Sequence, residues 1–537
     1  MRSSAANIES ITGGKVDAIK PRGPRNSLLD VYTHFPPEIL GYIFKWTVAR
    51  VQDDSPISDS TFNGLERGSY NFLFVCHRWF EVASDTPELW RFWGNNLQDW
   101  KKLCRFNRKV PVDLVLDERA GGPKVLGTSL QDELRDRATR DKIRQIHLKS
   151  EDLHLAGSIL SSLTPDGEST QEIKSIESII FHTSAVPETL NFFARSRLPR
   201  LQRLEITGHG VSRKPWWDHL TSQTTRLTVL SLHLTPPSLP IPTSQLNSIL
   251  LGNPNLEHLA LSDSSLPDDD EPRVRVPLRD LKTITFSGEF RSVFRLLQRL
   301  EFPVKLECMD LHMENATFED VRQTFGPFVG GFFRRGVWFQ DELDVMNSVH
   351  RDVVVYVGSR VDDHPRVASM SGLGPPSARF SISVTDRPPD LELKKLTLEL
   401  MAFIPRKHVE CLEMEHTLGV SEELFIAMPS LRTLWLRGVT LSDGFLQPNQ
   451  EGPRTDRKPL SSLRSLTLND VTVEDGNWRP LIKYLQDRTA DDEALCLSVV
   501  SKSEMPPEVE GEIRGLVREL EYTLQACGSR EPSVEHT

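Results

Sequence analysis

The chain has 537 residues, more than one compact core normally holds, so we expect at least two domains or an elongated repeat array. Hydrophobic residues make up 38% and charged residues 26%, which is typical of folded proteins and argues against a disordered chain. The formal net charge of −11 disfavours nucleic acid and anionic membranes as general partners, because both are bound by concentrated lysine and arginine. Local basic patches remain compatible with this charge.

The spacing of the cysteines and the lengths of the apolar runs indicate in which cellular compartment the protein is found. The six cysteines never occur at C-x-x-C spacing, so the sequence predicts neither a zinc site nor a redox motif. They are too scattered for a secreted disulfide scaffold. The first 20 residues lack the apolar stretch of a signal peptide, and no apolar run approaches the ~20 residues of a membrane span. We expect a cytoplasmic and/or nuclear protein that binds no metal and no cofactor.

A disordered tail is expected at residues 1–28, which are rich in Ser, Gly, Lys and Arg. A compact helical block follows at residues 29–100. Pro36 and Pro37 suit the first turn of a helix but cannot continue one backwards. The apolar residues behind them follow helical spacing, as do those of a second helix beyond the polar, turn-rich stretch at residues 51–70. These residues are Ile39, Leu40, Ile43 and Phe44 in the first helix, and Leu73, Val75, Cys76, Trp79 and Phe80 in the second.

Beyond residue 100 one apolar pattern recurs, in which apolar residues occupy the first, fourth and sixth positions of a hexamer. Hexamers that start at residues 176, 201, 227, 256, 281 and 306 are 25 to 29 residues apart. A fixed period in this range is the signature of leucine-rich repeats. The full set is IRQIHL from Ile143, IESIIF from Ile176, LQRLEI from Leu201, LTVLSL from Leu227, LEHLAL from Leu256, LKTITF from Leu281, LECMDL from Leu306, LKKLTL from Leu393, VECLEM from Val409, LRTLWL from Leu431 and LRSLTL from Leu463.

Each hexamer ends in a short strand whose alternate residues point inward, and strands of successive repeats are expected to stack in parallel. The predicted fold class is α/β, with residues 101–500 forming an irregular leucine-rich-repeat solenoid around an inner parallel sheet. The solenoid is expected to be irregular because the ninth repeat position lacks the usual asparagine. Between the hexamers at residues 306 and 393, the segments RDVVVYVGS and ARFSISV indicate strands of degenerate repeats, with a small inserted domain as the alternative.

The C-terminal segment at residues 501–537 is predicted to be a capping helix and a tail. The run PPEVEGEIRGLVRELEYTLQ, which starts at Pro506, begins with prolines and continues with good helix formers. Such a helix would cover the exposed last repeat of the solenoid.

Strand side chains that do not point inward lie on the second face of the sheet, the usual ligand surface of a solenoid. Candidate target-binding residues on this face are Arg203, His233, Glu413, Trp435 and Arg437. Trp435 is the kind of aromatic found at binding hot spots, with packing beneath a neighbouring loop as the alternative. The histidines at equivalent positions of separate repeats fit an ordinary polar surface better than a metal site.

An enzymatic function has no support in the sequence. Neither a P-loop, nor a G-x-S-x-G nucleophile elbow, nor an H-E-x-x-H zinc motif, nor a strand-linked dinucleotide fingerprint is present. We therefore predict no catalytic residues and a non-catalytic chain.

The helical block resembles an F-box, a motif that begins with Leu-Pro-x-Glu and continues with a Val-Cys-x-x-Trp helix and a Leu-Trp turn. The matching residues are Pro36, Pro37, Glu38, Ile39 and Leu40, then Val75, Cys76, Arg78 and Trp79, then Leu89 and Trp90. Phe35 stands where the motif usually has leucine, and the loop at residues 51–70 is longer than usual. With the repeats behind this block, the whole chain is similar to fungal F-box proteins that carry an irregular leucine-rich-repeat region.

The resemblance implies a substrate-recognition subunit of an SCF-type E3 ubiquitin ligase. The F-box of such a subunit docks on a Skp-family adaptor, which links it to cullin and RING subunits, while the repeat domain binds a target protein. The residues at the adaptor-binding positions are Pro36, Pro37, Leu40, Ile43, Phe44, Val75 and Trp79.

Two alternatives remain open. The helical block would also serve as a self-contained cap packed on the first repeat. The whole chain would also serve as a non-ligase F-box and repeat scaffold, which binds partners without directing ubiquitin transfer.

Overall fold

A computed structural model of the chain divides it into two compact units, residues Met1–Val110 and Pro111–Thr537. The predicted helical block was expected to end at residue 100, so the division falls slightly later in the chain. The described residues are 35–53, 76–93, 110–117, 134–150, 159–164, 171–183, 192–193, 196–209, 226–235, 241–263, 266, 274–302, 306, 308–314, 318–334, 353–358, 378–384, 411–415, 428, 430–438, 440–441, 460, 462–473, 476–489 and 495–524. The predicted tail at residues 1–28 lies outside them, as does the hexamer at residue 393.

Unit 1, residues Met1–Val110, contains helix α2 (Pro37–Asp53), helix α4 (His77–Ser84), the 3-10 helix η2 (Pro87–Trp90) and the short strand β1 (Phe92–Trp93). Helix α2 starts where the prolines predict, and the Leu40 N–H donates to the Pro36 carbonyl over 3.1 Å. The apolar faces of these elements enclose one small core. It consists of Leu40, Phe44, Val82, Ala83, Leu89 and Trp90, with Phe35 and Trp79 packed against it.

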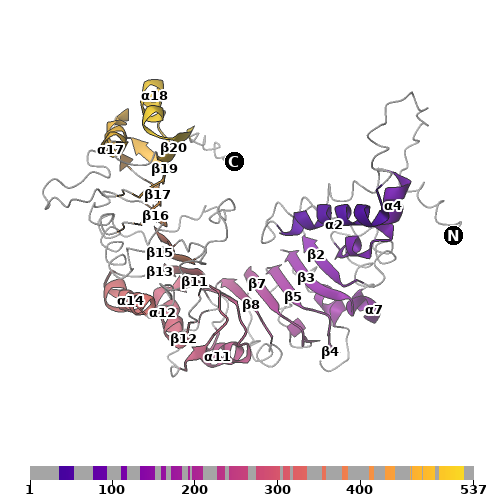
Figure 1. The fold of residues 1–537 in the computed structure, drawn as a ribbon. Helices are drawn as coiled ribbons and strands as arrows, with labels where there is room; N and C mark the ends of the chain where they lie inside the picture. The colour runs from indigo at the N-terminus through magenta and orange to yellow at the C-terminus, as the bar shows by residue number, and fades with distance from the viewer. Residues whose placement is uncertain are drawn as a thin grey trace, which may run out of the picture. The chain divides into compact units, whose positions relative to one another are not determined.

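Unit 2, residues Pro111–Thr537, is a mixed α/β unit built on a large parallel sheet, as the predicted fold class requires (Figure 1). Its outermost described strands, β2 and β21, do not pair with each other, so this sheet is open rather than a closed barrel. In spatial order the strands are β2 (Val112–Asp117), β3 (Ile143–Ser150), β5 (Ser178–Thr183), β7 (Arg203–His209), β8 (Val229–Thr235), β9 (His258–Asp263), β11 (Thr283–Glu289), β13 (Cys308–Glu314), β15 (Ala378–Val384), β14 (Val353–Gly358), β16 (Cys411–Glu415), β17 (Thr433–Arg437), β19 (Ser465–Val473), β20 (Cys496–Ser501) and β21 (Glu519–Leu524).

Short pairs flank this sheet. Strand β4 (Gln171–Glu172) pairs with β6 (Ser196–Arg197), and β10 (Val276–Pro277) pairs with β12 (Leu300–Glu301). Strand β18 (Thr440–Leu441) pairs with the end of β19.

The described helices of unit 2 pack on one side of the strands, and the core lies between the two layers. They are α7 (Arg137–Arg140), α11 (Thr243–Gly252), α12 (Phe290–Arg299), α13 (Phe318–Asp320), the π-helical η5 (Val321–Phe325), α14 (Gly326–Arg334), α17 (Arg479–Thr489) and α18 (Pro507–Leu516). Figure 1 shows α11, α12 and α14 following one another beside β8, β11 and β13. Strand β11 illustrates the alternation, because Ile284 and Phe286 are fully buried while their neighbours are partly exposed.

The same tight turn precedes many strands. In five repeats the first residue of the hexamer donates its N–H to the carbonyl three residues before, for example Leu201 to Leu198 over 3.1 Å and Leu431 to Met428 over 3.2 Å. The residue that begins each turn is buried, and a proline follows it in three cases, which matches the backbone angle of that turn position. The starting residues are Leu198, Asn253, Leu278, Met428 and Leu460.

Backbone and side-chain bonds link successive repeats where the asparagine ladder is absent. The Gln202 carbonyl accepts from both Thr228 N–H, over 2.7 Å, and Val229 N–H, over 3.0 Å, and this bifurcated pattern recurs along the sheet. Asn253 adds a buried side-chain link, because its Oδ1 accepts from Leu227 N–H over 2.8 Å. Arg488 links α17 to the preceding turn by donating to the carbonyls of Leu460 and Leu463.

The strands predicted at residues 306–393 are confirmed as β14 and β15, and both belong to the large sheet rather than to a separate domain. Their order was not predicted. Strand β15 lies between β13 and β14, with Asp310 opposite Ser381 and Ser381 opposite Tyr356. The sequence does not reveal this order, because the two strands have similar apolar patterns and suit either place.

The predicted C-terminal capping helix is wrong beyond Leu516. Helix α18 ends there, Val517 adopts extended backbone angles, and Glu519–Leu524 forms strand β21. The physical reason is tertiary: the open edge of β20 offers backbone partners along all six positions of β21, and this pairing outweighs helix propensity.

Candidate functional site

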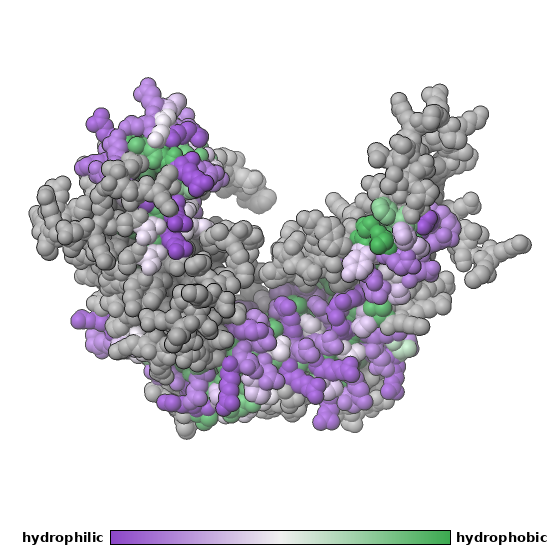
Figure 2. All heavy atoms as spheres, in the orientation of Figure 1, coloured by the Kyte–Doolittle hydropathy of each residue, from purple (hydrophilic) through white to green (hydrophobic). Residues whose placement is uncertain are grey.

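Helix α2 presents an apolar face outward as well as one inward. Ile39, Tyr42 and Ile43 are 47%, 75% and 40% exposed, whereas Leu40 and Phe44 are buried in the core. A helix advances about 100° per residue, so the spacing i, i+3, i+4 places the three exposed side chains on one strip. We call Ile39, Tyr42 and Ile43 the outer strip. Figure 2 shows apolar surface in unit 1 where α2 and α4 meet.

The predicted adaptor-binding residues divide between this surface and the core. Pro36, Pro37 and Ile43 are exposed, and Trp79 is half-buried against the core. Leu40 and Phe44 are 0% and 1% exposed, so they act as core residues here and do not touch the surface where a partner would dock. The i, i+4 spacing of Leu40 and Phe44 marked one apolar face of the helix correctly, but it marked the inner one. Val75 lies outside the described residues.

Tyr42 was missed, and Ile39 was not counted among the adaptor-binding residues. Both lie on the outer strip with Ile43, and their spacing was visible in the sequence. The signal was ambiguous because α2 is apolar on two sides, and only packing decides which side becomes core.

Specific contacts hold α2 and α4 in place. The Phe44 and Trp79 rings lie 5.1 Å apart, and Arg78 Nη2 donates to the Phe35 carbonyl over 2.7 Å. Gly41 brings α2 close to η2, since a Cβ at this position would lie 3.2 Å from Thr86 Oγ1. The helix that carries the outer strip is therefore fixed by packing against α4 and η2.

The predicted target-binding residues fall into two groups on the second face of the sheet. Arg203 and His233 lie on the neighbouring strands β7 and β8, while Glu413, Trp435 and Arg437 lie on β16 and β17. Glu413 is directly opposite Trp435 in the register. Five strands separate the groups, namely β9, β11, β13, β15 and β14, so the structure does not unite the five residues in one site.

Both residues of the first group, Arg203 and His233, already make polar contacts within the sheet. Arg203 pairs with Glu205 of the same strand at 2.6 Å, and His233 Nδ1 lies 3.1 Å from Ser262 Oγ on β9. Trp435 is half-buried, which fits both the binding and the packing interpretation. In the view of Figure 2 the described surface of unit 2 is mainly hydrophilic.

One row of side chains on the second face changes in burial along the sheet. Val115, His147 and Ile180 occupy equivalent positions of β2, β3 and β5 and are 7%, 2% and 4% exposed. The equivalent residues of the next strands, Glu205 and Ser231, are half-buried. This central row of side chains is therefore buried from β2 to β5 and half-buried on β7 and β8.

His147 is a buried ionisable group that the sequence did not single out. Burial, the neighbouring His182 and then Arg203 lower the pKa of His147 to about 3. The His147 and His182 rings lie 5.5 Å apart. The His147 ring is therefore neutral at physiological pH and contributes no charge to this face.

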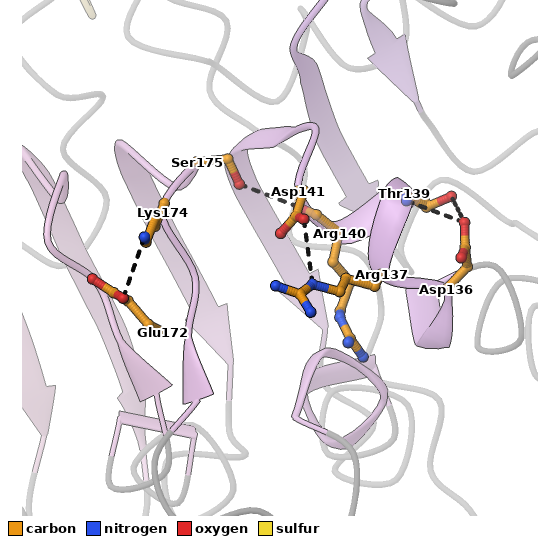
Figure 3. Close-up of polar contacts among 8 residues, drawn as sticks. All are labelled: Asp136, Arg137, Thr139, Arg140, Asp141, Glu172, Lys174 and Ser175. Atoms are coloured by element: carbon orange, nitrogen blue, oxygen red, sulfur yellow. Dashed lines mark hydrogen bonds and ion pairs between the residues drawn. The ribbon is translucent and has the colours of Figure 1, made fainter.

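Polar contacts surround the short helix α7 (Figure 3). Asp136 accepts from the N–H and hydroxyl of Thr139 at the start of α7, and Ser175 Oγ donates to the Arg140 carbonyl over 3.2 Å. Arg137 pairs with Asp141 at 3.7 Å and is largely exposed, so this pair adds little stability. These contacts cap α7 and join it to the segment that precedes β5.

Within the described ranges, no group of three or more His, Cys, Asp or Glu side chains is arranged to hold a metal ion. In the same part of the chain, none of the helices combines the length and the apolar character needed to span a bilayer. Neither the models of known protein families nor the curated proteins include a match to this chain.

Proposed function

We propose that this chain is an F-box substrate-recognition subunit of an SCF-type E3 ubiquitin ligase, with unit 1 as the F-box and unit 2 as an irregular leucine-rich-repeat solenoid. The observation that carries the proposal is the two-sided helix α2. Its inner side completes a core with α4 and η2, while the outer strip leaves three large apolar side chains in water. A cluster of this kind on a soluble unit is typical of a protein interaction surface.

Unit 2 supports the second half of the proposal. Most of its described strands from β3 to β19 fall on hexamers of the sequence repeat, and the described helices lie in the connections between strands. Such an arrangement leaves the second face of the sheet for a target protein. The chain itself supplies binding, and the ubiquitin-transfer chemistry belongs to the cullin and RING side of the complex.

The test is co-expression of the full chain with a Skp-family adaptor and a cullin, followed by copurification. A variant with Ile39→Asp and Tyr42→Asp places two carboxylates on the outer strip, and burying them against an apolar partner is strongly unfavourable. We expect adaptor retention to fall by at least about tenfold. Leu40→Asp does not serve this purpose, since Leu40 is fully buried and its replacement would unfold unit 1.

A matched control is Arg137→Asp, which changes the charge of an 84% exposed helical side chain in unit 2. This control should retain the adaptor fully. If the unmodified chain does not retain the adaptor, the proposal is wrong. If it retains the adaptor but never recruits cullin, the non-ligase scaffold is the correct function.

A further inference from the structure

Among the described strands, β21 is the last of the parallel sheet, and its far edge is open. Its residues Glu519–Leu524 pair with β20, and no other described strand pairs with them. Just before the strand, the Arg518 N–H donates to the Leu495 carbonyl over 2.9 Å, which also points toward the β20 side. An unpaired edge of this kind is a template for another strand.

The direction of the backbone hydrogen-bonding groups alternates along β21, and this shows which of them point to the open edge. Successive residues of a parallel strand direct their N–H and C=O groups to opposite sides, and Arg518 bonds toward β20. The backbone N–H and C=O groups of Leu520, Tyr522 and Leu524 therefore point toward β20 as well. The backbone groups of Glu519, Glu521 and Thr523 point to the open edge.

The chemistry of this edge is acidic, with an apolar end. Glu519 and Glu521 are exposed, and Leu524 is 48% exposed. The surrounding segment, residues 504–524, contains six glutamates and two arginines, and one of the arginines, Arg514, already pairs with Glu510 at 2.7 Å. A concentrated negative potential therefore surrounds the unpaired backbone groups.

A second copy of this chain is a poor occupant of the edge. Pairing two β21 strands would bring Glu519 and Glu521 of both copies together, and like charges across paired strands are destabilising. The same carboxylates favour lysine or arginine side chains on an incoming strand.

We propose that the open edge of β21 binds an extended, basic segment of a partner protein, which adds to the sheet as a further strand. Main-chain hydrogen bonds to Glu519, Glu521 and Thr523 supply the affinity, and charge pairing with the two glutamates supplies the selectivity. The binding groups are the backbone groups at the edge of β21, whereas Glu519 and Glu521 lie opposite Cys496 and Ser498, so their side chains stand at the margin of the second face. The proposal goes beyond the proposed ligase function because it assigns this edge, which that function does not use, and a basic strand as its occupant.

The test uses the full chain and a fluorescent peptide of about ten residues in which lysine and valine alternate. We expect the peptide to bind and to slow amide hydrogen exchange in residues 519–523. The same peptide with N-methyl groups on alternate amides cannot pair and should not bind. Glu521→Pro removes one outward N–H without removing a bond to β20, and should weaken binding roughly tenfold.

Matched variants separate pairing from simple charge attraction. Glu521→Gln should weaken binding of the peptide, whereas Glu504→Gln, at an exposed position outside the strand, should leave it unchanged. The variant with Ile39→Asp and Tyr42→Asp should bind the peptide normally, so failure of adaptor docking and failure of this proposal are distinguishable.

Equal binding of the N-methylated peptide would overturn the proposal, because only non-specific attraction would then remain. Absence of binding, or a self-associated protein whose exchange at residues 519–523 is already slow, would overturn it as well. If Glu521→Pro does not fold, the comparison of the N-methylated peptide with the unmethylated one still tests whether binding requires strand pairing.

Discussion

His147 shows how burial sets the charge of a single side chain in unit 2. The ring lies on the second face of the sheet, where most positions are polar, yet it is only 2% exposed. Burial is the largest cause of its lowered pKa, and the nearby His182 and Arg203 act in the same direction. Protonation of His147 therefore destabilises the folded state but not the unfolded state.

Stability should consequently depend on pH through this residue. The folded pKa of His147 is about 3, against 6.5 for an ordinary histidine, so below pH 6.5 the unfolded chain binds the extra proton. We expect the free energy of unfolding to fall as the pH drops from about 6.5 toward 3, by a few kcal/mol at most. Urea denaturation of the chain and of His147→Gln at pH 7.5 and pH 5 measures the difference.

The variant should lose part of the pH dependence, because glutamine has no proton to take up. His77→Gln is the matched control, since its side chain is 84% exposed, and it should behave like the unmodified chain. An unchanged pH dependence in His147→Gln would show that other groups, such as paired carboxylates, account for it.

Among the elements, the turn before β9 shows how the irregular repeats are joined. Most of these turns start with a buried apolar residue, but one starts with Asn253. Its Oδ1 accepts from Leu227 N–H of the preceding repeat, and its Nδ2 donates to the Ile249 carbonyl over 2.7 Å. One side chain therefore serves two repeats.

Asn253→Ala should destabilise unit 2 by about 2–3 kcal/mol, because it leaves two buried backbone groups without these partners. Denaturant unfolding followed by tryptophan fluorescence measures this loss. Asn255→Ala is the matched control in the same turn, since Asn255 is exposed and should change stability by less than about 0.5 kcal/mol. Equal effects of the two variants would mean that Asn253 does not link the repeats.

Helix α2 shows what an amphipathic pattern can and cannot predict. The start of the helix and its apolar spacing were predicted from Pro36, Pro37 and the residues behind them. Which of its two apolar sides faces the core was not, because Leu40 and Ile39 are of similar character and differ only in what packs against them. The candidate docking residues of α2 are therefore those of the outer strip and not Leu40 and Phe44.

At the scale of the whole molecule, the strand order of unit 2 is the feature most open to direct test. The register places Asp310 of β13 opposite Ser381 of β15, with Tyr356 of β14 one strand further away. Neighbouring strands lie about 4.8 Å apart, whereas strands separated by another lie about twice as far apart, beyond the reach of a disulfide.

A cysteine pair at Asp310→Cys and Ser381→Cys should therefore oxidise readily, while Asp310→Cys with Tyr356→Cys should not. Both pairs are made in a chain whose own cysteines are replaced by serine, and the bond is detected by mass spectrometry. Reversed results would show that the strands follow the order of the sequence instead.

The sequence by itself determined the local features: the start of α2 and most of the strands of unit 2. These follow from proline geometry and from short apolar periods, which act within a few residues. Strands β2 and β20 were missed because their hexamers do not begin with leucine, isoleucine or valine. Only the tertiary structure decided which side of α2 is buried, where β15 lies and whether residues 519–524 form a helix or a strand. Each of these depends on a partner distant in the chain, and local propensity differs too little between the alternatives to choose among them.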